Sequence, residues 1–362
     1  MANNGVFKTI GPNDVGSSTT ALHEQIPVTG TIISGTYGSF PSESNVKYFS
    51  PSDHIDIYDY PHASSSANFL FSITAGVSSN ASIQPELQAA RKNNIYRQFA
   101  QQYVGYDTNQ DFVEFNASGV LNPVNAFPPK VDNAVFIDLS RVIMKDEIKK
   151  GSFQIQIGTG SVLSPFEAGL FKTYSDAHVV EGNQATYKTN SPMGEYALLQ
   201  DGTTTTVPSS TQNGLLYYQA GLLVLFGNTQ TFGSEFQSGS FYGNDEARSP
   251  IQAFVSSSID QISNATRAKI RNIQFNNTTE LNSTTYFLRA SNNEFNYSNN
   301  PSFVSGSEIK VKAGLASNPS VAYITTVGLY SADNQLLAVG KLSEPLKKTP
   351  NDEINVKMRI DY

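Results

Sequence analysis

Residues 353–362 read Glu-Ile-Asn-Val-Lys-Met-Arg-Ile-Asp-Tyr, and polar and apolar side chains alternate at every position. Successive side chains of a β-strand point to opposite faces, so this pattern predicts a strand with one buried and one solvated face. Residues 67–75 and 151–158 show the same two-residue period. Half-buried strands are typical of antiparallel sheets, because parallel sheets are covered on both faces. We therefore predict a mainly β fold, built as an antiparallel sandwich or of jelly-roll-like sheets.

Three short stretches between apolar runs carry turn-forming residues: Asp201-Gly202, Asn213-Gly214 and residues 331–335. Each can supply the tight or left-handed backbone that a hairpin requires, so each is predicted to be a turn.

The third turn would join a strand at residues 321–330 to one at residues 336–342. A proline-bounded loop, residues 345–350, would then lead to the final strand and complete a C-terminal β-meander. Chain ends fray unless they are docked, whereas the alternation here continues to Tyr362. We expect the final strand to pair within its own sheet or along the edge of a neighbour.

Two segments have a helical pattern. Residues 85–104 open with a proline, place Leu87, Arg91, Ile95, Phe99 and Tyr103 at four-residue steps, and end before Gly105. Residues 250–265 follow Ser249 and place Ile251, Phe254, Val255 and Ile262 on one side. Both are predicted to pack on a sheet.

The pattern divides the chain into four parts. Residues 1–30 have little periodicity before residue 26 and are interpreted as an extended N-terminal assembly arm, because they bury too little to order alone. Residues 31–158 are predicted to be a β-rich core that holds the first helix. Residues 159–248 are rich in Gly, Ser, Thr and Tyr and fit an inserted β subdomain. Residues 249–362 would complete the β-rich core with the second helix and the meander.

The amino-acid composition limits the kinds of partner that the chain can bind. Only 15% of the 362 residues are charged, and the formal net charge is −7, which argues against a broad nucleic-acid-binding face. Arg267, Lys269 and Arg271 form a small basic group that is interpreted as a solvated face. The chain has no cysteine, so disulfides and thiolate metal sites are excluded.

No export signal is recognisable in the sequence. The longest apolar run, residues 222–226 with its flanks, is too short to span a bilayer, so no membrane partner is expected.

Few residues suggest chemistry. On a strand, His54, Asp56 and Tyr58 would share one face that could hold a metal, but a strand with polar side chains on its outside, followed by a Tyr-Pro turn, is the favoured explanation. Residues 158–160 resemble part of a phosphate loop but lack the following lysine and helix, so they are interpreted as a turn. We therefore assign no catalytic, cofactor-binding or metal-binding residue and expect no cofactor and no enzyme activity.

Three regions carry a resemblance. The first region comprises residues 7–10 and 17–37, and the second comprises residues 273–290 and 293–301. The third, residues 323–348, reads Tyr-Ile-Thr-Thr-Val-Gly-Leu-Tyr-Ser-Ala-Asp-Asn-Gln-Leu-Leu-Ala-Val-Gly-Lys-Leu-Ser-Glu-Pro-Leu-Lys-Lys. Together they resemble virion structural proteins of contractile-tailed bacteriophages, such as myophages of cyanobacteria and other marine bacteria. The region of residues 159–248 is poorly covered.

The resemblance implies a particle component in the tail, baseplate or neck, a baseplate wedge subunit above all. It further implies that the chain is made in the host cytoplasm and joins other virion proteins, as a homo- or hetero-oligomer in a ring. Two other classes stay open on the sequence: a receptor- or glycan-binding module at the particle surface, and a polysaccharide-degrading enzyme, although the absence of tryptophan disfavours sugar stacking.

Overall fold

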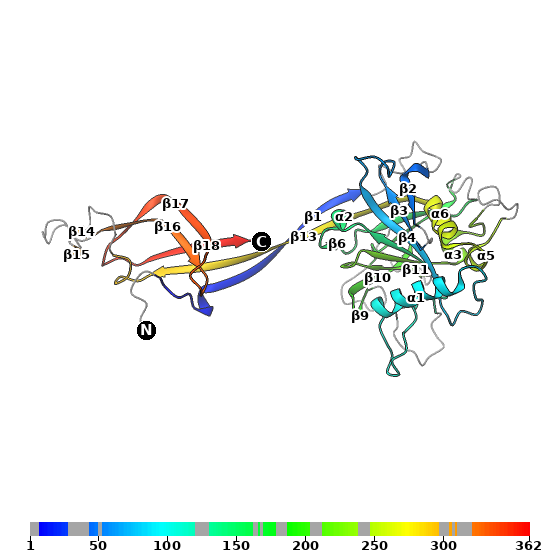
Figure 1. Cartoon of the computed structure of the whole chain (residues 1–362), viewed down its shortest axis with the longest axis horizontal. Coiled ribbons are helices and arrows are strands. Elements are labelled where there is room, and N and C mark those ends of the chain that lie inside the picture. Colours follow the sequence, from blue (N-terminus) through cyan, green and yellow to red (C-terminus); the bar gives the residue numbers. More distant parts are fainter. Residues whose placement is uncertain are drawn as a thin grey trace. The chain divides into compact units, whose positions relative to one another are not determined.

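The computed structural model describes residues 7–27, 43–49, 53–119, 130–161, 166, 169–178, 187–202, 212–237, 247–296, 304–305, 308–309 and 321–362. The chain divides into two compact units. Unit 1 comprises Met1–Ala21 and Glu280–Tyr362, and unit 2 comprises Leu22–Thr279. The prediction of a mainly β fold with antiparallel sheets is confirmed (Figure 1).

The strands are β1 (Val15–Pro27), β2 (Val46–Tyr48), β3 (Ile55–Tyr58), β4 (Phe69–Val77), β5 (Asn133–Leu139), β6 (Glu147–Ile148), β7 (Gln154–Gly158), β8 (Phe171–Ser175), β9 (Tyr187–Ser191), β10 (Gly194–Asp201), β11 (Gln212–Tyr217), β12 (Leu222–Phe226), β13 (Ile270–Ala290), β14 (Val304–Ser305), β15 (Glu308–Ile309), β16 (Ala322–Tyr330), β17 (Leu336–Lys348) and β18 (Ile354–Asp361). The α-helices are α1 (Ala89–Tyr103), α2 (Arg141–Met144), α3 (Thr229–Phe232), α5 (Pro250–Ser256) and α6 (Ile259–Lys269), and short 3-10 helices cover Pro12–Asp14 and Glu43–Asn45.

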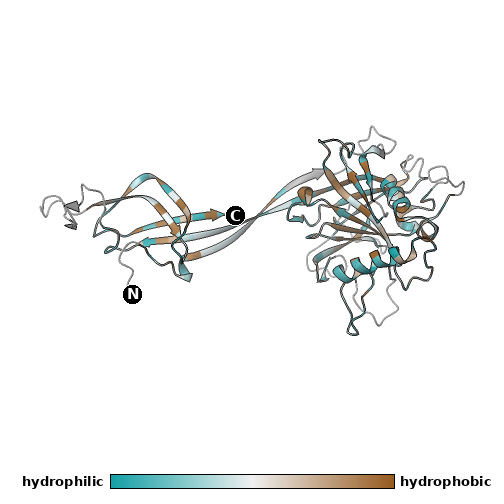
Figure 2. Ribbon diagram, in the orientation of Figure 1, coloured by the Kyte–Doolittle hydropathy of each residue, from teal (hydrophilic) through white to brown (hydrophobic). Residues whose placement is uncertain are grey.

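Unit 2 is built on one curved sheet. Its strands follow the order β13-β7-β8-β10-β11-β12-β5-β4-β3-β2. Val46 on β2 and Ile273 on β13 lie at opposite ends of this order, yet both belong to one cluster of buried side chains. The two ends of the sheet therefore enclose a common core, as in a β-sandwich. Figure 2 shows hydrophobic residues, in brown, along the strands of this unit.

The middle strands of unit 2 are buried on both faces. Leu223 and Leu225 of β12 point into the common core, whereas Leu222, Val224 and Phe226 point into a second cluster on the other face. Side chains of α1 cover this second cluster, and the Tyr103 ring lies 4.8 Å from the Tyr217 ring on β11. A strand covered on both faces needs apolar residues at every position, which explains the uninterrupted run of β12.

α1 lies close to the sheet because a glycine faces it. A Cβ atom added at Gly76 of β4 would lie 2.9 Å from both the backbone nitrogen and the Cβ of Tyr96 on α1. The Tyr96 hydroxyl then donates to the Val131 carbonyl at 2.6 Å and accepts from the Phe115 amide at 3.1 Å. The residue at 76 thus sets the separation of helix and sheet.

The first helix begins later than predicted. α1 starts at Ala89, since Gln88 has a positive φ of 54° and interrupts any helix from residue 85. The amides of Glu86 and Leu87 donate instead to the Val255 carbonyl, and Leu87 is exposed. The buried face consequently runs along Lys92, Tyr96, Ala100 and Tyr103, one position away from most of the predicted stripe.

The predicted helix at residues 250–265 is two helices. Ser258 starts α6 with a capping box, in which its side chain accepts from the Gln261 amide and the Gln261 side chain accepts from the Ser258 amide. Ser257 is non-helical and separates α6 from α5. Capping serines at the break therefore outweigh the continuous helical period.

Two further sequence interpretations are corrected. Asn213-Gly214 is not a turn but lies within β11, where a Cβ at Gly214 would be 2.6 Å from the Val224 carbonyl oxygen of β12. The described part of residues 159–248 includes β8 to β12, which are consecutive members or partners of the main sheet of unit 2, so it is not a separate subdomain.

The expected N-terminal arm is also different. Val15–Pro27 form β1, which pairs with β13 of the same chain. The low periodicity of this stretch hid a strand whose partner lies far away in the sequence. Residues 1–6 and 28–30 of the predicted arm lie outside the described residues.

Unit 1 has two small β-layers. β18 pairs with β13 from Ser283↔Asp361 to Ala290↔Ile354 without a shift in register, while β16 and β17 form a separate hairpin. A Cβ at Gly340 of β17 would lie 3.5 Å from the Met358 side chain, so the hairpin packs on the apolar face of β18. The predicted turn at residues 331–335 is confirmed, with Asn334 at a positive φ of 60°.

The predicted meander and the loop at residues 345–350 are wrong. β18 pairs with β13 and not with β17, and β17 continues to Lys348. Pro345 is tolerated because the register shifts between Ile324 and Thr326 of β16, which leaves Pro345 in a bulge outside the pairing ladder.

We expect Gly76→Ala to destabilise unit 2 by about 1–3 kcal/mol, because the added methyl group overlaps the α1 backbone and the helix must move. Urea unfolding of the full chain measures the change. Gly16→Ala is the control, since nothing lies within 4 Å of a Cβ at that position. Equal stability of the Gly76→Ala variant and the wild-type chain would show that α1 is not in close contact with β4.

Candidate functional site

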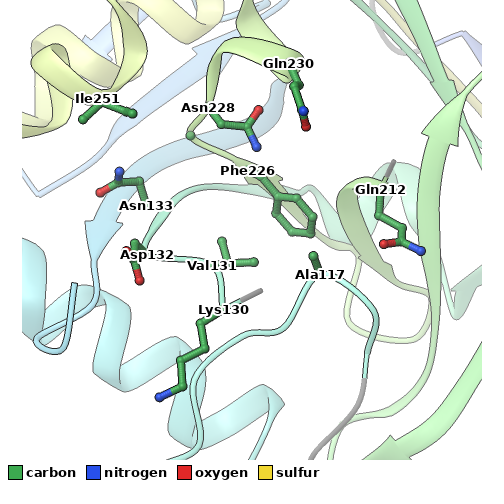
Figure 3. Close-up of a pocket in the computed structure, with 11 residues that line it drawn as sticks. Ala117, Lys130, Val131, Asp132, Asn133, Gln212, Phe226, Asn228, Gln230 and Ile251 are labelled. Carbon is green, nitrogen blue, oxygen red and sulfur yellow. The ribbon is translucent and has the colours of Figure 1, made fainter. Parts of the chain in front are cut away.

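A cavity of about 470 Å³ with a mixed polar and apolar lining lies in unit 2 (Figure 3). Asp132 and Asn133 lie on one side of Phe226 and Gln212 on the other, and Lys130 extends away from the ring. The full lining comprises Ala117, Lys130, Val131, Asp132, Asn133, Gln212, Phe226, Gly227, Asn228, Gln230 and Ile251.

The charged and capping groups of this cavity are already used by the fold. The Lys130 ammonium lies 2.6 Å from the buried Glu114 carboxylate. Burial raises the pKa of Asp132, while a hydrogen bond from the Ser82 backbone opposes that rise. The Asn228 side chain accepts from the Thr231 amide and caps α3. The remaining polar groups of the lining are the amide side chains of Asn133, Gln212 and Gln230, beside the Phe226 ring and small apolar side chains.

The residues weighed as a metal site do not converge. His54 stacks on Phe49 at 4.3 Å between ring centroids, and its Nε2 atom is 3.8 Å from Asp56 Oδ1. Asp56 accepts from the Ser72 hydroxyl at 2.5 Å, while the Tyr58 ring lies against Phe69. Among the described residues, no group of three His, Cys, Asp or Glu side chains could hold a metal ion.

The basic group at residues 267–271 is not a solvated face, which corrects the sequence interpretation. Arg267 and Lys269 are buried. Lys269 donates to the Gly160 carbonyl at 2.6 Å, which ties α6 to the glycine turn that resembled a phosphate loop. The Arg271 guanidinium lies over the Phe171 ring at 4.3 Å. The sequence alone does not predict that Arg267 and Lys269 are buried, because charged side chains normally lie at the surface.

Two further buried charges stabilise unit 2. The Lys92 ammonium on α1 donates to the carbonyls of Phe254 and Ser257 at 2.6 and 2.7 Å, at the C-terminal end of α5. Helix C-terminal carbonyls lack partners within the helix and favour a cation. Burial lowers the pKa of Lys92 to about 8. The side chain thus fastens α1 to α5.

The second is Asp176. Its carboxylate accepts from the Tyr218 hydroxyl and from the amides of Gly151 and Phe153, each at 2.8 Å. Burial raises the pKa of Asp176 to about 6, although these hydrogen bonds oppose the rise. A perturbed carboxyl often marks an active site, but every bond here holds a turn in place. We interpret Asp176 as structural.

The most distinctive surface lies on unit 1. The outward face of the β16–β17 hairpin carries Tyr330, Leu336, Leu337 and Val339, and the Phe7 ring packs edge-on against Tyr330 at 5.1 Å. We name these five residues the hairpin surface. Leu337 is 68% exposed and Val339 is 56% exposed.

Glycine shapes this surface as well. A Cβ at Gly328 would lie 2.9 Å from the Tyr330 ring and 3.3 Å from Leu336, so both side chains lie over the glycine. Contiguous exposed apolar side chains mark interaction surfaces, because leaving them in water is unfavourable. The signal in the sequence was Leu336-Leu337-Ala338-Val339, which follows the turn and leaves no polar face for solvent.

The chain matches no protein-family model, no curated protein and no solved structure. None of the described helices is long and apolar enough to cross a membrane.

We expect Lys92→Met to lower the free energy of unfolding, because the carbonyls of Phe254 and Ser257 lose their donor. A buried polar group without a partner costs about 1–3 kcal/mol. The unfolded lysine titrates near 10.4 and the folded one at about 8, so the unfolded state binds more protons between these values. The part of the stability that depends on pH is therefore complete above the unfolded pKa and is lost as the pH falls through 8, and the cost of the two lost hydrogen bonds adds to it. The difference in unfolding free energy between wild type and Lys92→Met should grow between pH 8 and pH 10.

Denaturant unfolding at several pH values measures this slope. Lys341→Met serves as the control, because Lys341 is exposed and the variant should follow the wild-type curve. A Lys92→Met curve that stays parallel to the wild-type curve would contradict the assignment.

Proposed function

We propose that this chain is a structural component of a tailed bacteriophage particle and mediates protein–protein assembly in the tail, baseplate or neck. The observation that carries the proposal is the hairpin surface, where Leu337 and Val339 lie more than half exposed. A subunit that meets neighbours in a particle covers such side chains on assembly. The resemblance of residues 323–348 to virion proteins of contractile-tailed phages includes this same hairpin.

The composition is compatible with this function. Ordering long charged side chains at an interface costs more conformational entropy than ordering Ser, Thr or Asn. A chain with 15% charged residues therefore suits repeated contact with other subunits. The proposed partners are other virion proteins, arranged as a homo- or hetero-oligomer in a ring, and the proposed location is the virion after synthesis in the host cytoplasm.

Particles purified from infected cultures should contain the chain, as measured by mass spectrometry, and its density should lie in the tail, baseplate or neck. Complementation with Leu337→Glu/Val339→Glu should leave the purified chain folded but prevent its incorporation, because two carboxylates would be buried in the interface. Val142→Glu is the matched control, since Val142 is 85% exposed on α2 of unit 2 and lies outside the hairpin surface. Normal incorporation of the double variant would contradict a role for the hairpin surface, and particles without the chain would contradict the function.

A second candidate is a receptor- or glycan-binding module, which the amide-lined cavity of unit 2 favours. In that case the chain should bind a defined glycan on an array, and Gln212→Ala/Gln230→Ala should weaken binding by about ten-fold, from the loss of neutral hydrogen bonds. Gln98→Ala, at an exposed position of α1, should not change binding. If the chain binds no glycan on the array, the glycan-binding function is rejected, and the proposal of a role in assembly is not affected.

A further inference from the structure

β18 presents a row of outward-pointing backbone groups. Asn282 and Tyr362 exchange both backbone hydrogen bonds, at 3.2 and 2.8 Å. In an antiparallel ladder such pairs recur at every second residue, so Ile354, Val356, Met358 and Ile360 also direct their N–H and C=O groups to β13. The N–H and C=O groups of Asn355, Lys357, Arg359 and Asp361 therefore point to the opposite edge. Among the described strands, none pairs with that edge.

This edge lacks most of the usual protection. Exposed edges are normally blunted by proline, by bulges, by inward-pointing charges or by charged side chains such as lysine, and of these β18 has only the charges on its outer face, such as Lys357 and Arg359. β17 has such protection, because Pro345 and a register shift interrupt it. β18 contains no proline, pairs with β13 without a shift, and has only apolar side chains on its inner face. It is a regular template for one more strand.

We propose that the occupant of this edge is β18 of a second copy of the chain, paired antiparallel about a two-fold axis. An isologous contact uses the same patch on both copies and closes on itself. This pairing depends on β18 alone and not on membership of a phage particle, and it names a partner that the proposed function leaves open.

The charges of residues 353–361 favour one of the longer registers. With Arg359 opposite Glu353 of the second copy, Lys357 faces Asn355 and opposite charges meet at both ends of the paired segment. On the inner face, Val356 then meets Val356 and Ile354 meets Met358, which extends the apolar face on which the hairpin packs. A register with Lys357 opposite Lys357 also brings Glu353 opposite Asp361 and is repulsive. Among the registers that pair at least seven of residues 353–361, charge complementarity therefore favours this alignment.

Sedimentation velocity of the full chain over a range of concentrations tests the proposal, together with hydrogen exchange of the β18 amides. Dimers should form, and the amides of Asn355, Lys357 and Arg359 should become protected as the concentration rises. Those of Val356 and Met358 should be protected throughout by β13. A chain that stays monomeric, or a dimer in which the Lys357 amide remains unprotected, would overturn the proposal.

Lys357→Pro removes an edge donor without removing a bond to β13, because the Lys357 amide points away from that strand. It should weaken dimerisation by about ten-fold or more, whereas Lys357→Ala, which keeps the amide, should not. Dimers of unchanged affinity in Lys357→Pro would mean that the copies meet elsewhere, for instance through the hairpin surface.

A charge swap tests the register without proline. Glu353→Arg and Arg359→Glu should each weaken dimerisation, and the double variant should restore it, because opposite charges again face each other. Absence of rescue in the double variant would reject this alignment. Particle incorporation of the same variants is a separate measurement, so failure of the pairing and failure of the proposed function can be told apart.

Discussion

The fold of unit 2 depends on burying the middle strands of its sheet on both faces. β12 contributes Leu223 and Leu225 to the common core and Leu222, Val224 and Phe226 to the cluster beneath α1. Because neither face meets water, the helix has to approach the sheet closely, and Gly76 permits this at Tyr96. Burial of Lys92 follows from the same approach, since its ammonium reaches the end of α5. The doubly covered sheet thus positions α1, its contact with the end of α5 and the connection at Val131.

Local patterns in the sequence predicted local structure well. Alternation located β4, β7 and β18, and the turn at residues 331–335 joins the strands it was expected to join. Strand partners were harder, because pairing is decided by contacts between distant residues. β18 pairs with β13 and not with the adjacent β17, and β1 pairs with β13 although its own sequence has little period. Gly214 looked like a turn residue because the close approach of Val224 cannot be seen in one dimension.

At the candidate sites, too, the sequence predicted local arrangement but not burial or long-range contacts. Arg267 and Lys269 read as solvated, but the fold buries them and Lys269 binds a carbonyl. His54 and Asp56 lie near each other as a strand period implies, yet Tyr58 turns to Phe69. The sequence shows the apolar run from Leu336 to Val339, but it does not show that these side chains are exposed. Apolar residues in a strand normally indicate a buried core. Unit 2 thus gathers many of its apolar side chains into two buried clusters, whereas the apolar side chains of the hairpin surface on unit 1 are exposed.

The buried lysines have a practical consequence for mapping neighbours by chemistry. Amine-directed cross-linkers need a solvent-accessible nitrogen, and the ammonium groups of Lys92 and Lys269 are enclosed by protein and bonded to carbonyls. Lys348 is enclosed in the same way, with three oxygen partners. These three positions will stay unmodified in any folded sample, so their labelling reports damage to the preparation. Lys341, on the β16–β17 hairpin, is open to reagent and will report which molecule lies against that part of unit 1.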